Sequence, residues 1–193
     1  GLRVTGHFTM SQDAAITTPS ITLAVVHGVF AQLFLSTLVA LFCVTTPLWR
    51  RAVAAIHPGA GIDHGLSRIL VIMVIVQLML GAVLRHVAHG LLFHITMATI
   101  VAGTALFAGM RAWGEHRGQP VIPYLGRGLM VLVTTQLVLG VLALWGTSLT
   151  TTRQAPHLLD VIFTTTHQTV GAVILTMSVM LMLWTRRLVR SQA

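Results

Sequence analysis

The sequence predicts an all-α protein, a polytopic transmembrane helical bundle of about five spans. Of its 193 residues, 55% are apolar and only 8% are charged, and the mean hydropathy is +0.85. A water-soluble globular protein does not need so apolar a composition. Uncharged apolar runs of about 20 residues are long enough to cross a hydrocarbon core at a helical rise of about 1.5 Å per residue. The arginines cluster between these runs, as the connections of a membrane protein require.

Each expected span is an apolar run bounded by charged or helix-breaking residues. The runs are 21–47, 69–84, 91–110, 128–147 and 158–185. Proline and glycine in the connections, such as Pro58 and Pro120, favour turns. Four segments follow: an outer N-terminal segment, a first bundle half of three spans, an inner linker loop and a shortened second half of two spans. Their expected bounds are 1–20, 21–112, 113–127 and 128–193.

The basic residues predict the orientation of the bundle. All twelve are arginine, and the formal net charge is +8. With the N-terminus outside and the C-terminus inside, the outer side keeps three, Arg3, Arg85 and Arg153, and the inner side holds the other nine. This is the positive-inside bias, which accounts for the charge without a nucleic-acid partner. The first residues resemble no signal peptide, and we expect chain to precede Gly1.

Three histidines lie within the apolar runs, each with a small residue four positions later. The pairs are His27 with Ala31, His94 with Ala98, and His167 with Gly171. Positions i and i+4 share a helix face, so each ring would stand over a gap that a flat ligand can enter. All three lie roughly 25–35 Å along a helix from the inner arginines, in the outer half of the membrane. Neutral imidazole is a good haem-iron ligand, and the alternative is a hydrogen bond to a neighbouring helix.

A short internal repeat places two of these histidines in equivalent hairpins. The segments Gln77–Gly81 and Gln136–Gly140 have the same Q-x-x-L-G pattern, and an inward-running span with His94 or His167 follows each. Gly81 and Gly140 permit either close helix packing or the approach of a porphyrin, and packing is the commoner reason. The two glutamines would hydrogen-bond across the bundle or orient a ligand.

Other polar residues lie near the outer ends of the spans. Arg85 would pair with a haem propionate or extend to the membrane interface. His86 and His89 form a weak candidate metal pair without an acidic or thiol partner nearby. Asp160 would transfer protons or favour the start of its helix. The only cysteine, Cys43, is interpreted as a small buried residue.

The repeated Q-x-x-L-G arm, the extension Gly81–His86, the arms with His27 and His94, and the pair His167–Gln168 resemble the haem A synthase family of cytochrome oxidase assembly. The opening Gly1–Gly6 is similar to the segment after that family's first span. The resemblance implies two related four-helix halves, one holding haem O as substrate and the other haem b. It also implies oxidation of a haem O methyl group to a formyl, with His27 and His94 as one axial pair and His167 as a ligand of the second half.

The chain departs from this family in ways that leave its activity open. Ala24 and Gly28 stand where the family has glutamate and arginine, the outer cysteine pair is absent, and five spans replace eight. We therefore expect a shortened or divergent member that binds haem through His27 and His94, with His167 serving a second haem or a neighbouring subunit. Three functions remain: haem A synthase-like oxidation, a b-type cytochrome subunit that transfers electrons, and a haem-free scaffold of a larger membrane complex. The expected partners are lipid and either other membrane subunits or a second copy of the chain, in a bacterial inner (cytoplasmic) membrane.

Overall fold

The computed structural model describes residues 21–87, 89–148 and 158–191, and in these ranges it is almost entirely helical. Arg3, Arg153 and the N-terminal segment 1–20 lie outside the described residues. The helices are α1 (Ile21–Thr45), α2 (Pro47–Arg51), α3 (Ala60–Val87), α4 (Leu91–Glu115), α5 (Ile122–Ser148) and α6 (Leu158–Leu188). Two short strands, β1 (Ala55–Ile56) and β2 (Val189–Arg190), pair in parallel. All helices except α2 are long and apolar enough to cross a membrane, which confirms the predicted fold class.

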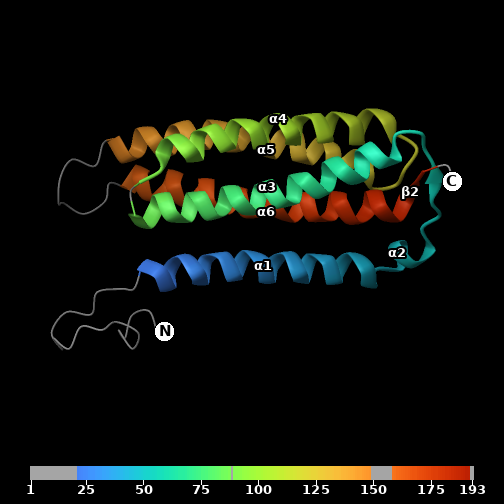
Figure 1. Ribbon diagram of the computed structural model, residues 1–193, viewed down its shortest axis with the longest axis horizontal. Coiled ribbons are helices and arrows are strands. Elements are labelled where there is room, and N and C mark those ends of the chain that lie inside the picture. Colours follow the sequence, from blue (N-terminus) through green and yellow to red (C-terminus); the bar gives the residue numbers. More distant parts are fainter. Residues whose placement is uncertain (1–20, 88, 149–157, 192–193) are drawn as a thin grey trace.

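Helices α3 to α6 form a four-helix bundle, and α1 lies beside it (Figure 1). Each of α3 and α5 packs against both α4 and α6, so the four helices close into a ring. Helix α1 contacts α3 and α6, on the side of the molecule away from α4. Of its described side chains, only Ala24 and Cys43 are buried, and large apolar residues cover much of its surface. Such a surface suits lipid, and the chain is an integral membrane protein.

The chain runs up and down the bundle, so most of the described arginines lie toward one end, which we call the inner end. The C-termini of α1, α4 and α6 and the N-termini of α3 and α5 lie there (Figure 1). The opposite, outer end holds the connection between α3 and α4. In this connection Gly90 has φ of 90°, a left-handed conformation that lets the chain turn directly into α4.

Small residues bring α4 and α5 into close contact near the inner end. A Cβ atom built on Gly126 would lie 2.6 Å from the carbonyl oxygen of Gly109 and 2.9 Å from the backbone nitrogen of Trp113. Ala105 and Ala112 of α4 are buried in the same region. In a membrane, where lipid is as apolar as the helix surfaces, such backbone approach supplies the packing energy that holds helices together.

Two expected boundaries were wrong at the inner end. Helix α3 begins at Ala60 and not at 69, and the expected linker 113–127 is shortened because α4 continues to Glu115 and α5 begins at Ile122. Polar residues in the first turns of α3 are buried within the bundle. Asp63 is 5% exposed and bonds to groups on and after α4, while the Ser67 hydroxyl donates to the carbonyl oxygen of Asp63.

Hydrogen bonds fasten the end of α6 to the start of α3. The pairing of β1 with β2 continues in a bond from the His57 backbone nitrogen to the Arg190 carbonyl oxygen, 2.9 Å long. The Nε2 atom of His64 lies 3.1 Å from the Val189 carbonyl oxygen. These contacts join the start of α3 to the end of α6 and close the inner end of the bundle.

Candidate functional site

Two histidines from α4 and α6 face each other inside the outer half of the bundle. The ring centroids of His94 and His167 are 6.4 Å apart, and the ring planes are inclined by 67°. Both side chains are partly buried. Since α4 and α6 are separated in the ring by α3 and α5, the two imidazoles meet across the centre of the bundle.

Each imidazole is held by a glutamine from the other helix of its own hairpin. The Nε2 atom of Gln77 lies 3.1 Å from Nδ1 of His94 and donates to the His94 carbonyl oxygen, also at 3.1 Å. The Nε2 atom of Gln136 lies 3.3 Å from Nε2 of His167. The repeated glutamine and histidine thus form two similar half-sites, which meet at the centre of the bundle.

The repeated glycines make room for the histidine rings. A Cβ atom on Gly81 would lie 3.2 Å from Cε1 and 3.7 Å from Nδ1 of His94, and a Cβ atom on Gly140 would meet the same two atoms of His167 at the same distances. Both glycines therefore lie against the imidazoles. The matching distances show that the two hairpins are structurally equivalent at this level.

Gly171, the small residue four positions after His167, lies against two protein side chains in this structure. A Cβ atom on Gly171 would lie 3.3 Å from Nε2 of Gln136 and 3.3 Å from a methyl carbon of Leu78. The gap that the i+4 spacing predicted for a flat ligand is filled by these two side chains. Any ligand entering there would displace Leu78 or turn the Gln136 amide.

Three buried polar atoms around the imidazole pair have no hydrogen-bond partner among the described residues. They are Nδ1 of His167 and the Oε1 atoms of Gln77 and Gln136. An unsatisfied buried polar atom costs about 1–3 kcal/mol, so three of them at one point call for an explanation. When a metal occupies one nitrogen of an imidazole, the other nitrogen carries a proton and needs an acceptor, and a glutamine oxygen is one. The unpaired atoms are of the types that a metal-bound histidine pair would use.

The other predicted site residues lie away from this pair. His27 is exposed on α1, and α1 and α4 lie on opposite sides of the bundle (Figure 1), so the structure does not bring His27 to His94. Arg85 is exposed at the outer end of α3 and donates a hydrogen bond to Oε1 of Gln168, beside His167 in the chain. Asp160 lies in the first turn of α6, where a carboxylate favours the helix dipole.

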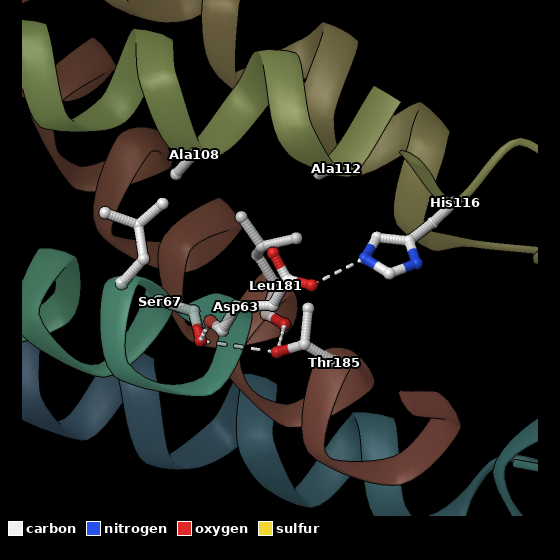
Figure 2. Close-up of a pocket in the computed structure, with 8 residues that line it drawn as sticks. Asp63, Ser67, Ala108, Ala112, His116, Leu181 and Thr185 are labelled. Carbon is white, nitrogen blue, oxygen red and sulfur yellow. Dashed lines mark hydrogen bonds and ion pairs between the residues drawn. The ribbon is translucent and has the colours of Figure 1, made fainter. Parts of the chain in front are cut away.

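A second polar cluster, which the sequence analysis missed, lies at the inner end. Oδ1 of Asp63 accepts a bond of 2.8 Å from Nε of Arg111, and Oδ2 lies 2.9 Å from Nε2 of His116. Figure 2 shows the contact between Asp63 and His116. Both residues line a void of about 10 Å³, enough for one water molecule. The His57 ring lies 4.7 Å from the His116 ring, centroid to centroid. The sequence signal that could have indicated this cluster is Asp63, an acidic residue in a mostly apolar chain. His57 and His116 lie in connections between the helices.

Comparisons with known proteins assign neither site. A scan against protein-family models, a search of curated proteins and a search of solved structures each found no match to this chain. Any function must therefore be argued from the arrangement of the residues themselves.

Proposed function

We propose that this membrane protein binds haem in the outer half of its bundle, with His94 and His167 as the axial ligands. The separation of the two rings carries the proposal. An iron–nitrogen bond is about 2.0 Å long and the centre of an imidazole lies about 1.1 Å beyond its nitrogen, so two axial rings are about 6 Å apart across a haem iron. The observed centroid separation of 6.4 Å is close to this spacing.

The surrounding residues fit a pair of ligating imidazoles. Gln77 and Gln136 each approach a ring and each keep an unpaired carbonyl oxygen. Such an oxygen can accept the proton on the nitrogen that does not bind iron, which fixes the ring orientation and increases its basicity. The glycines leave each ring the space it needs.

Haem uptake would require the side chains beside the rings to move. The two cavities described in the structure adjoin the inner end, and Leu78 and Gln136 fill the space next to Gly171. We expect the outer ends of the two hairpins to separate as a porphyrin enters between them. Exposure of Leu92 and Phe93 at the start of α4 is consistent with entry from the lipid.

Electron transfer is the activity that this ligand set favours. His94 and His167 would both hold the iron, and a haem bound in this way would supply one-electron redox chemistry. The resulting protein would be a b-type cytochrome subunit that works with other membrane subunits or a second copy of the chain. The arginine distribution supports an orientation with the haem near the outer face, and the membrane we propose is a bacterial cytoplasmic membrane.

Oxidation of haem O to a formyl product is the second candidate. It is favoured by the resemblance of the Q-x-x-L-G arms and their histidines to the haem A synthase family. On this alternative, His27 on the exposed surface of α1 would contribute to a second site completed by another subunit. Haem extraction distinguishes the two candidates, because an electron carrier keeps haem B and a synthase converts supplied haem O.

The proposal is tested with the purified full chain and three single variants. We expect a Soret band and a low-spin six-coordinate spectrum from the unaltered protein, and loss of the low-spin signal in both His94→Ala and His167→Ala. The matched control is His27→Ala, which should keep the spectrum. Loss of the signal in His27→Ala with retention in His167→Ala would instead support the His27 and His94 pair, and no Soret band at all would leave only a scaffold.

A further inference from the structure

The inner-end cluster gathers a set of metal-binding side chains far from the proposed haem site. His57, Asp63 and His116 each offer a ligand atom, and these atoms all lie within 4.8 Å of one another. Asp63 and His116 are buried, and the His57 side chain is 26% exposed. We propose that these three residues bind a divalent transition-metal ion, for which two imidazoles and a carboxylate make Zn²⁺ the best match.

The spacing of the ligand atoms requires little movement to accept the ion. Zinc–nitrogen and zinc–oxygen bonds are about 2.0–2.2 Å long, so neighbouring ligand atoms in a tetrahedral site are about 3.4 Å apart. The distance between Oδ2 of Asp63 and Nε2 of His116 is 2.9 Å, and the widest pair in the set is within 4.8 Å. Side-chain rotations that move the rings of His57 and His116 by about 1 Å close that difference.

Neighbouring charges are arranged as a metal site needs. Arg111 holds the other oxygen of Asp63 at 2.8 Å, which fixes the carboxylate and leaves Oδ2 directed at His116. Such partners behind the ligands orient them and increase the affinity for metal. Oε2 of Glu115 lies 3.8 Å from Nε2 of His57, so this oxygen can serve as the fourth ligand. Two carboxylates against one guanidinium leave a net negative charge for the cation.

A cavity gives the ion a path from the inner surface. It measures about 180 Å³ and is lined by His57, Glu115, His116 and Gln119, among others. Asp63 lies behind His116, on the side toward the bundle interior, where Figure 2 shows its carboxylate bonded to the imidazole. An ion entering this cavity meets His57 and His116 before it reaches Asp63.

Bound metal would clamp the inner end. His57 follows β1 and Asp63 lies close by in the first turn of α3, whereas His116 follows α4, so one ion would tie the start of α3 to the end of α4. Nε2 of His116 and Oδ2 of Asp63 are already hydrogen-bonded, so a bound ion would replace this hydrogen bond with two metal–ligand bonds. The site is independent of the proposed haem ligands, which lie near the other end of the bundle.

The test uses the chelator-treated full chain in detergent, with Co²⁺ as an absorbing probe and Zn²⁺ as competitor. We expect one Co²⁺ per chain, the intense visible absorption of a tetrahedral site, and displacement of Co²⁺ by Zn²⁺. His57→Ala should weaken Co²⁺ binding by about 100-fold, because a ligand is lost. This variant is preferred to one at Asp63 because His57 is partly exposed and its loss leaves no buried charge unpaired.

Two matched variants show whether Co²⁺ binds at the inner end or at histidines elsewhere in the chain. His89→Ala removes an exposed histidine at the outer end and should leave Co²⁺ binding unchanged. The double variant His94→Ala/His167→Ala should also bind one Co²⁺, whether or not the haem proposal holds. Absence of stoichiometric binding, unchanged affinity in His57→Ala, or an equal loss in His89→Ala would each overturn the inner-end metal site.

Discussion

Replacing Gly126 with alanine should force α4 and α5 apart where they come closest. The new Cβ atom would lie 2.6 Å from the Gly109 carbonyl oxygen, 2.8 Å from the Ala112 methyl carbon and 2.9 Å from the Trp113 backbone nitrogen. Ordinary contacts between such atoms are about 3.4 Å or more, so the helices must separate by about 0.5–0.8 Å. Two of the three opposing atoms are backbone, and no side-chain rotation can relieve the overlap.

The free energy of unfolding should fall by about 2 kcal/mol in Gly126→Ala. Overpacking of a tight contact costs about 1–3 kcal/mol. The cost here should be near the upper value because two of the three opposing atoms belong to the backbone. The higher helix propensity of alanine returns about 1 kcal/mol. The matched control is Gly103→Ala in α4, where a Cβ atom meets nothing within 4 Å and only the propensity gain of about 1 kcal/mol remains.

Reversible unfolding by SDS in mixed micelles, followed by circular dichroism, measures both variants against the original chain. The difference of about 3 kcal/mol between them corresponds to about 100-fold in the unfolding equilibrium constant. Gly126→Ala unfolding at the same SDS fraction as Gly103→Ala would refute the close packing of α4 on α5.

Three further outcomes follow from contacts elsewhere in the bundle. Asp63→Asn should lower the free energy of unfolding by about 2 kcal/mol in the same titration, because the partly buried Arg111 guanidinium loses its counter-ion, and an unchanged midpoint would contradict this. Gln136→Leu should raise the reduction potential of the haem-loaded protein, since His167 becomes a less basic ligand, and a redox titration that shows no shift would argue against the glutamine's role. His64→Ala should speed hydrogen exchange at the amides of β2 while leaving the centre of α5 protected, as mass spectrometry would record.

The fold could be predicted from the sequence because the length of the apolar runs and the placement of the arginines can both be recognised from nearby residues alone. All five long helices lie within a few residues of the expected spans except at the inner end, where α3 and α5 begin earlier and α4 ends later. There, Asp63 and Ser67 precede the expected span 69–84 but lie within α3. Their hydrogen-bond partners include Arg111 and Thr185, which are far away in the sequence, so burial of these polar groups could not be foreseen from nearby residues.

The candidate site was only partly predictable for a related reason. The repeat correctly associated Gln77 with His94 within one hairpin, as hairpin neighbours must meet. The distance of each histidine from the inner arginines, however, placed all three histidines at one level in the membrane. This distance cannot show which helices face each other. Packing of α1 outside the ring exposes His27 and leaves His167 opposite His94. The inner-end pair of His57 and His116 was missed because both lie in connections, where sequence periodicity carries no information.

The equivalence of the α3–α4 and α5–α6 hairpins has an evolutionary consequence. Because the two glycine–histidine contacts have the same distances, one hairpin associated with a copy of itself would reproduce the central pair. A homodimer of a short two-helix ancestor could therefore have had the same centre before gene duplication and fusion joined the copies. Co-expressing the two hairpins as separate peptides would recreate that ancestral assembly in the laboratory.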